Sequence, residues 1–530
     1  MVICRRVFLY GYWTIMTISD NKRIAKNTLL LYFRMILTIV VGLYTSRVVL
    51  NTLGVSDYGV YNVVGGIVAM LSFLNSALTA ASQRFIAFEL GRGDIIKLRK
   101  IFCTSVTIHV TLAVIILVIA ETIGLWFVNT HLNIEAERMV AANWVYQCSI
   151  FTFMLTVLSV PYNSCIVAHE HMNAFAYISI LEVTLKLLIV YLLLVISFDK
   201  LITYGILVFS VALVVRLAYG IYCKRHFEEC TYCFGFDKGL FNEMFSFAGW
   251  SVVGNLGFSF KDQLANIILN LFFGTVVNAA RGVALQVNGI ISGFSTNFMM
   301  ALSPQITKEY AAGNTEKSIS LVYAGCRYSF FLLLLMVAPV LVNVDYLLRL
   351  WLVVVPEYTS EFLCLALITA LFYSMAPPLV TALQATGNVK VFQLTICIVM
   401  LCELPLAYAV LCLGGLPYMS MYPTVLVTLV GIFVRFVVLR RMVAGYSLRY
   451  FCFSIVGRNI VVCAISLILA YYVRSLFIAG FWSFVFTSVL SCLIVAVTVS
   501  YLGMSRNERQ KVISKVSRYI RKLIYRKQQE

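Results

Sequence analysis

AASQRFIAFELGRGD (residues 80–94) and ALSPQITKEYAAGNT (residues 301–315) show the same arrangement of residues at an offset of about 220 positions. In each stretch a glutamine, Gln83 or Gln305, is followed eight residues later by a glycine and then by a polar segment. Further matched positions are Asn51 with Asn270, Pro161 with Pro377 or Pro378, and Arg216 with Arg435. Between these positions both halves consist of long apolar runs. The sequence therefore predicts two similar bundles of membrane helices, an organisation typical of transporters.

Composition indicates that most of the chain lies in a membrane. Of the 530 residues, 61% are hydrophobic and 12% are charged, with a mean hydropathy of +0.91, whereas soluble domains contain about 25% charged residues. A helix needs ~20 apolar residues to cross a bilayer. About fourteen segments have that length, and they begin near Asn27, Tyr58, Ile101, Ala141, Phe175, Leu201, Met244, Thr275, Leu321, Glu361, Val391, Tyr418, Gly457 and Gly480. Long continuous runs favour helices over a β-barrel. We therefore predict an all-α polytopic membrane protein.

The net charge of +18 is unevenly distributed. Basic residues crowd alternate loops, such as residues 84–100, and the loops between them hold few. Positively charged loops stay in the cytoplasm, so both termini are predicted to be cytoplasmic, as an even number of spans requires. The basic C-terminal run has apolar residues at helical spacing, which favours an amphipathic helix on the membrane surface over a nucleic-acid site. Translation starts either at Met1 or at Met16, just before the first span.

Polar residues inside the predicted spans mark the candidate site, because a charge at the bilayer centre costs ~2.5–3.5 kcal/mol. On the span that begins near Met244, one face carries Ser251, Asn255, Ser259, Asp262, Asn266 and Asn270. On the next span, a similar stripe is formed by Asn278, Arg281, Asn288, Ser292 and Ser295. In the first span, Arg34 shares a face with Thr38 and Thr45. Such stripes either line a water-filled cavity or form hydrogen bonds between helices.

We predict a substrate-binding cavity that these polar residues line. Its primary residues are Arg34, Asn255, Asp262, Arg281 and Asn288, and its secondary candidates are Arg47, Lys261, Asn266 and Glu403. Glu403 is either a proton site or the buried partner of a cation.

Metal binding and catalysis are not predicted. The segment that contains Cys223, His226, Cys230 and Cys233 offers zinc ligands, but their spacing matches no zinc pattern well. We therefore expect reduced thiols, no metal and no other cofactor. No nucleotide-binding or hydrolytic motif is found, and the predicted loops are short. The sequence accordingly favours a protein that is not an enzyme.

TLGVSDYGVYNVV, from Thr52, and QRFIAFELGRGD, from Gln83, together with the two-fold repeat, resemble the polysaccharide transport family of flippases. This family belongs to the multidrug, oligosaccharidyl-lipid and polysaccharide exporter superfamily, and the resemblance covers about residues 20–503. It implies two six-helix lobes with pseudo-two-fold symmetry and two further helices. The implied regions are an N-terminal extension (1–20), an N-terminal lobe (21–240), a C-terminal lobe (241–443), transmembrane helices 13 and 14 (444–503) and a basic cytoplasmic tail (504–530).

The resemblance implies translocation of an undecaprenyl-diphosphate-linked oligosaccharide, an O-antigen or capsule repeat unit, across the bacterial inner membrane by alternating access. Arg34 and Arg281 suit the diphosphate, because arginine binds phosphate bidentately. Asp262 suits an arginine partner or a coupling proton or sodium ion. Membrane lipids and a polysaccharide polymerase are further implied partners. The alternatives are a cation-coupled multidrug exporter of the same fold and a flippase for a peptidoglycan lipid precursor.

Overall fold

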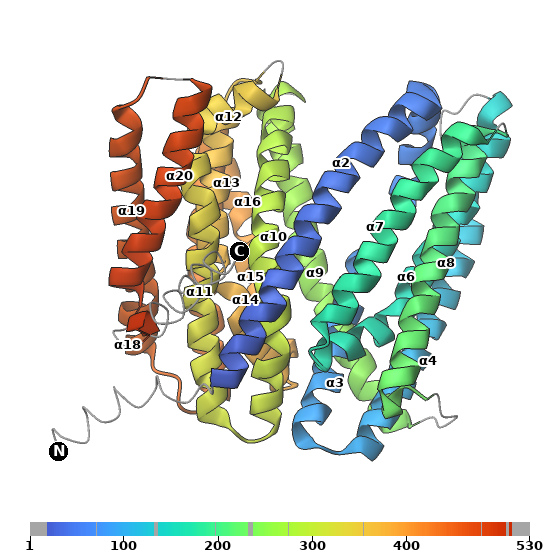
Figure 1. Cartoon of the computed structure of the whole chain (residues 1–530), viewed down its shortest axis with the longest axis horizontal. Helices are drawn as coiled ribbons and strands as arrows, with labels where there is room; N and C mark the ends of the chain where they lie inside the picture. Colours follow the sequence, from blue (N-terminus) through green and yellow to red (C-terminus); the bar gives the residue numbers. More distant parts are fainter. Residues whose placement is uncertain are drawn as a thin grey trace, which may run out of the picture. The chain divides into compact units, whose positions relative to one another are not determined.

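The computed structural model describes residues 18–69, 72–131, 136–196, 198–231, 237–273, 275–352, 355–478, 480–504 and 508–510. These residues form helices joined by short connections and contain no strand (Figure 1). Met1, Met16 and most of the basic C-terminal tail lie outside the described residues.

The helices follow one another closely along the chain. In the first half they are α2 (Ile18–Ala69), α3 (Ser72–Arg92), α4 (Ile95–Ile119), α5 (Leu125–His131), α6 (Met139–Ala168), α7 (Met172–Val195) and α8 (Lys200–His226). In the second half they are α9 (Lys238–Phe273), α10 (Thr275–Ala311), α11 (Thr315–Val342), α12 (Val344–Trp351), α13 (Thr359–Tyr373), α14 (Ala376–Ala385), α15 (Lys390–Leu401), α16 (Glu403–Cys412), α17 (Tyr422–Met442), α18 (Leu448–Tyr450), α19 (Arg458–Ser475) and α20 (Phe481–Thr498). Short 3₁₀ or π segments are η1 (Ala120–Gly124), η2 (Ala136–Arg138), η3 (Glu228–Cys230), η4 (Pro417–Met421), η5 (Phe451–Gly457) and η6 (Val499–Gly503).

Ten helical segments among the described residues are long and apolar enough to cross a membrane. Each of them contains or adjoins one predicted span start. These are the four starts from Ile101 to Leu201 and the six starts from Leu321 to Gly480. The four other predicted starts lie in longer helices: Asn27 and Tyr58 in α2, Met244 in α9 and Thr275 at the start of α10. The prediction of an all-helical, multi-pass membrane protein is confirmed.

One glycine separates the first two predicted spans. Gly54 has φ 80° and ψ 169°, which interrupts the helical geometry of α2. A residue with a Cβ rarely adopts a positive φ, whereas glycine does so freely. The apolar run before Gly54 and the run after it are therefore two helices joined at a kink, as the predicted starts at Asn27 and Tyr58 require.

The chain divides into two compact units. The first unit comprises the described residues up to Asp262 together with Asn297–Val322 and Val380–Leu401. The second unit comprises Gln263–Thr296, Tyr323–Leu379 and the described residues from Cys402 onward. Segments of α10, α11, α14 and α15, which lie in the predicted C-terminal lobe, thus belong to the same unit as the first half of the chain. The boundary of the two predicted lobes stays a prediction.

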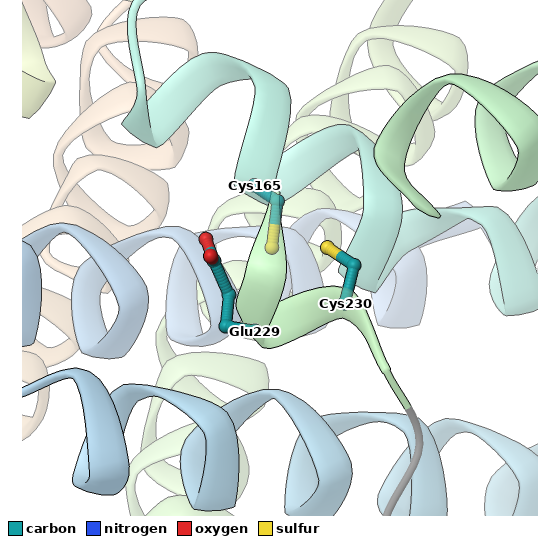
Figure 2. A group of neighbouring side chains, drawn as sticks. All are labelled: Cys165, Glu229 and Cys230. Atoms are coloured by element: carbon teal, nitrogen blue, oxygen red, sulfur yellow. The ribbon is translucent and has the colours of Figure 1, made fainter. Parts of the chain in front are cut away.

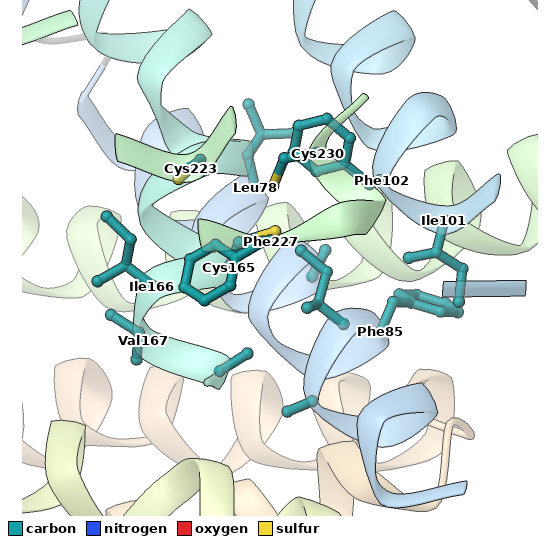
Figure 3. Packing of buried hydrophobic residues seen from close by; sticks show 14 of the residues in the cluster. Leu78, Phe85, Ile101, Phe102, Cys165, Ile166, Val167, Cys223, Phe227 and Cys230 are labelled. Carbon is teal, nitrogen blue, oxygen red and sulfur yellow. The ribbon is translucent and has the colours of Figure 1, made fainter. Parts of the chain in front are cut away.

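The first unit is organised around α6, which packs against α3, α4 and α8, while α7 packs against α2 and α8 (Figure 1). A core of this unit contains the buried side chains of Phe85, Phe102, Ile166 and Phe227 (Figure 3). Burial of this apolar surface, at about 25 cal/mol per Å², holds the ends of α3, α4, α6 and α8 in fixed positions. Polar residues at these ends are therefore held on a rigid frame.

The second unit contains the two C-terminal membrane helices. α19 packs against α20, and the hydroxyl groups of Ser466 and Thr498 lie 2.5 Å apart between them. Near the start of α20, Thr487 donates to Asn343 Oδ1 at 3.1 Å, which ties α20 to the connection between α11 and α12. Hydrogen bonds between otherwise apolar helices are a common means of association in lipid.

Candidate functional site

Arg34 lies in α2 of the first unit, and side chains from two other helices hold its guanidinium group. Its Nη2 donates to Asn297 Oδ1 of α10 at 3.0 Å, and its Nη1 donates to Ser179 Oγ of α7 at 3.4 Å. The centre of the Phe175 ring lies 4.6 Å from Cζ, where the π face of the ring attracts a cation. Three helices thus position one positive charge within the membrane-length bundle.

The direct hydrogen-bond partners of Arg34 are neutral. Its Nε is buried and has no hydrogen-bond partner among the described residues. Glu182 attracts Arg34 electrostatically, but this carboxylate is engaged by Lys186, whose Nζ lies 2.6 Å from Oε1. A buried charge without an ionic partner costs free energy. Arg34 therefore keeps both a positive charge and a donor with which to bind an anion.

Arg281 lies in α10 of the second unit and is 5% exposed. Its Nη1 donates to Asn266 Oδ1 of α9, so the predicted polar faces of these two helices meet. Two to three turns further along α10, Ser292 Oγ donates to Asn288 Oδ1 at 3.4 Å. Residues of the stripes thus form hydrogen bonds between and within helices. This agrees with the interpretation that the stripes hold helices together, which was the alternative to a water-filled cavity.

The other predicted residues of α9 lie in mixed surroundings. The side chain of Asp262 is 43% exposed, and one of its oxygens lies 3.3 Å from Lys261 Nζ. Lys261 itself is buried. Asn255 is partly buried. The side chain of Arg47 lies outside the described residues.

Glu403 is buried at the start of α16, where its carboxylate accepts a hydrogen bond from Thr424 Oγ1 at 2.8 Å. Of the predicted site residues, the first unit contains Arg34, Asn255, Lys261 and Asp262, and the second unit contains Arg281, Asn266, Asn288 and Glu403. A single cavity shared by both sets stays a prediction.

The repeated stretches, residues 80–94 and 301–315, contact each other within the first unit. A Cβ placed on Gly91 would lie 2.8 Å from Lys308 Cα and 2.9 Å from Ala311 Cβ, and still closer to the Lys308 carbonyl oxygen. Only glycine allows two backbones to approach this closely without displacement. The glycine that follows Gln83 in the repeat is therefore the point where α3 meets α10.

A buried carboxylate joins the same two halves of the chain. Glu170 lies between α6 and α7, and it accepts hydrogen bonds from Gln305 Nε2 at 3.0 Å and from Lys308 Nζ at 3.1 Å. Asn27 Nδ2 donates to the Glu170 carbonyl at 3.4 Å. The φ of Glu170 is +62°, a conformation that costs a residue with a side chain of order 1–3 kcal/mol and often marks a functional position.

The histidine beside this carboxylate does not compete with the lysine. Burial lowers the pKa of His171, and the basic groups of His169, His226 and Lys308 lower it further. Since an unperturbed histidine has a pKa of about 6.5, His171 is neutral at pH 7. Lys308 is then the cation that balances Glu170.

Arg84 makes a further link between the halves. Its Nε donates to the Gln384 carbonyl at 3.1 Å, and its Nη2 donates to the Ala385 carbonyl at 3.3 Å. These carbonyls end α14, where the helix dipole is negative and favours a cation. Gly387 has φ +83°, and a Cβ there would lie 2.7 Å from Arg84 Nη2. We call the contacts of Gly91, Glu170 and Arg84 with the second half of the chain the inter-repeat contacts.

An ion pair in the second unit was not predicted from the sequence. Arg327 in α11 is fully buried, and its Nη2 donates to Glu508 Oε1 at 2.6 Å. The Tyr328 hydroxyl donates to the same oxygen at 2.7 Å. Glu508 follows the last span, so no local pattern connects it with an arginine 181 residues earlier. This pair anchors the beginning of the C-terminal tail in the second unit.

Residues 251–409 match the family model of MatE. No curated protein is similar enough to this sequence to count as a match. Among solved structures, the chain is similar to the outward-facing form of a multidrug resistance MATE family transporter of the MOP superfamily. The two share 16% identity with a TM-score of 0.66, over 80% of this chain and 96% of the other.

Two further similar structures have different descriptions. One is the MATE transporter ClbM in complex with Rb⁺, at 13% identity and a TM-score of 0.64, over 80% of this chain and 96% of the other. The other is a MOP superfamily transporter from Pyrococcus furiosus with a binding pocket of reverse polarity, at 16% identity and a TM-score of 0.63, over 79% and 95%. At these identities the likeness establishes the fold, which is that of the MATE transporters.

Proposed function

We propose that this protein is a transporter that moves its substrate across the membrane by alternating access. The inter-repeat contacts support this proposal, because they join the two halves of the chain through hydrogen bonds and one close glycine approach. Contacts of this kind can separate and form again at modest free-energy cost. They lie beside the basic loop of residues 84–100, so they would close the path on the side predicted to be cytoplasmic.

The substrate that we propose is an undecaprenyl-diphosphate-linked oligosaccharide. The observation that carries this assignment is the surroundings of Arg34, which hydrogen-bonds to neutral acceptors and retains an unused donor. An arginine in a bundle of low dielectric constant attracts phosphate strongly and repels cations. Arg281 is buried and is the second candidate for the diphosphate.

Physical chemistry supports the same substrate class. A sugar hydroxyl that leaves water without a new partner loses ~2–7 kcal/mol, so a polar path along asparagine and serine side chains lowers the barrier. With a negative cytosol, an anionic head group that moves outward gains ~2.3 kcal/mol per charge per 100 mV. We accordingly place the protein in the bacterial inner membrane with cytoplasmic termini, where it would supply a polysaccharide polymerase.

A cation-coupled multidrug exporter is the second candidate. Asp262 favours it, because its side chain is 43% exposed in the middle of α9 and could accept a proton or a cationic substrate. The multidrug MATE transporter and ClbM with Rb⁺ share the fold. The Pyrococcus furiosus transporter, however, has a pocket of reverse polarity. The fold is therefore compatible with substrates of either charge, and the surroundings of Arg34 favour an anion.

The test is complementation of a bacterial strain that lacks its own flippase for a surface polysaccharide. We expect Arg34→Ala to abolish surface polysaccharide and to leave lipid-linked oligosaccharide on the cytoplasmic leaflet, with normal protein abundance. Arg216→Ala is the matched control, because Arg216 stacks on the Tyr162 ring at 4.0 Å near the predicted cytoplasmic end of α8 and should retain transport.

Full surface polysaccharide in the Arg34→Ala strain would refute the anionic assignment. Raised drug sensitivity with normal polysaccharide would favour the exporter instead.

A further inference from the structure

Two thiols and a carboxylate converge in the first unit, away from Arg34 and the inter-repeat contacts. The sulfur atoms of Cys165 and Cys230 and a carboxylate oxygen of Glu229 lie within 4.8 Å of one another, and all three residues are buried. In the view of Figure 2 the Cys165 sulfur lies between the Glu229 carboxylate and the Cys230 sulfur. Cys165 comes from the last turn of α6, and the other two residues come from η3.

A third thiol lies in the same core. Cys223, in the last turn of α8, is fully buried in the apolar cluster that contains Cys165 and Cys230, and its thiol donates to the Tyr162 carbonyl at 3.4 Å. The polypeptide leaves α8 through Phe227 and turns back in η3, which brings the second and third thiols together. The apolar side chains of Leu78, Phe102 and Phe227 surround them (Figure 3). The position of each sulfur is therefore fixed by the core.

Apolar packing explains buried thiols but does not explain the carboxylate among them. Glu229 is 4% exposed, and burial of a carboxylate costs several kcal/mol unless a cation or several donors satisfy it. Its partner is His169, whose Nε2 lies 2.5 Å from Oε1. A histidine that holds a ligating carboxylate in position is a frequent second-shell partner in metal sites.

We propose that Cys165, Cys223, Cys230 and Glu229 bind a thiophilic divalent cation, with zinc as the ion whose preferences fit best. Zinc takes four ligands in a tetrahedron and accepts sulfur, nitrogen and carboxylate oxygen. Three sulfurs and one oxygen from α6, α8 and η3 supply that set. Thiols on the side predicted to be cytoplasmic stay reduced and available for a metal.

The proposed ligands differ from the set that lies close together in the sequence, which is Cys223, His226, Cys230 and Cys233. His226 is not part of it, since its Nδ1 lies 2.9 Å from the Tyr222 carbonyl and its ring stacks on Tyr222. Cys233 lies outside the described residues. Cys165, which precedes the other ligands by 58 positions or more, takes part instead. The metal would tie the loop after α8 to the end of α6 and is independent of the proposed substrate.

The experiment uses the full-length protein, purified in detergent with a reducing agent and with its affinity tag removed. Zinc per chain is measured by inductively coupled plasma mass spectrometry after incubation with zinc and passage over a desalting column. We expect about one equivalent in the wild type, none in Cys165→Ser/Cys230→Ser, and one in both His226→Ala and Cys326→Ala. Cys326 is a matched control, because it is a buried thiol that donates to the Met375 carbonyl.

Affinity gives a second measurement that does not depend on the double variant. His169→Ala should weaken zinc binding roughly 10- to 100-fold in competition with a chromophoric chelator, as loss of a second-shell partner does. Cobalt added to the wild type should give the thiolate-to-cobalt charge-transfer band in the near ultraviolet. Wild-type protein that retains no zinc and shows no such band would overturn the proposal, as would full zinc content in the double variant.

Discussion

Substitution of Gly91 by alanine tests whether the inter-repeat contacts depend on a close backbone approach. The added Cβ would lie 2.8 Å from Lys308 Cα, and ordinary contact begins at 3.4 Å. α3 and α10 must therefore separate by at least about 0.6 Å, or the contact must break. Overpacking of this kind costs typically 1–3 kcal/mol, which shifts the balance between closed and open forms roughly 5- to 150-fold toward the open form.

The assay is hydrogen exchange followed by mass spectrometry, on the purified protein, with peptides that cover residues 80–94 and 301–315. We expect faster exchange in both peptides of Gly91→Ala. Gly249→Ala in α9 is the matched control, because a Cβ there meets nothing within 4 Å, and alanine raises helix stability by up to about 1 kcal/mol. Equal protection of the two peptides in both variants would refute the reasoning.

Three further changes test other contacts. In a double-mutant cycle on thermal stability, Glu170→Gln and Lys308→Gln should show a coupling energy of about 0.5–3 kcal/mol. If the effects of the two substitutions simply add, the two side chains do not stabilise each other. Glu508→Ala should lower stability by about 1.5–3 kcal/mol, because it removes a charged acceptor from Arg327 and Tyr328; the same loss in Arg509→Ala would instead indicate a general effect of the tail. Asn297→Ala should cost about 1–3 kcal/mol through loss of the 3.0 Å acceptor of Arg34, and an unchanged melting temperature would contradict that role.

The length of the hydrophobic runs predicted much of the fold. The predicted start at Phe175 lies near the beginning of α7, the start at Tyr418 lies in η4, and Gly54 separates two spans within α2. Local spacing also accounts for the Glu182–Lys186 pair, since positions four apart on a helix face each other. These features depend on residues close together in sequence or on the thickness of the bilayer. Both can be inferred from one amino-acid sequence.

Long-range partners could not be predicted in this way. Arg34 was selected for its position in a span, but its acceptor Asn297 lies 263 residues away. Cys165 lies at the end of another helix from Cys230, so local cysteine spacing could not show that these two thiols lie close together. Glu170 lies in a short loop that only the folded chain brings to Gln305. The repeat was the one feature of the sequence that could have indicated the contact between residues 80–94 and 301–315, because equivalent segments of a two-fold structure meet near its axis.

The most direct measurement compares the binding of undecaprenyl diphosphate and neutral undecaprenol to the purified protein by native mass spectrometry. The wild type should prefer the diphosphate by roughly 10- to 150-fold, which corresponds to about 1.5–3 kcal/mol for hydrogen bonds to a charged group. Arg34→Gln should lose most of this preference, and Arg34→Lys should keep part of it. An equal preference in the wild type and Arg34→Gln would show that this partly buried cation does not recognise the anionic head group.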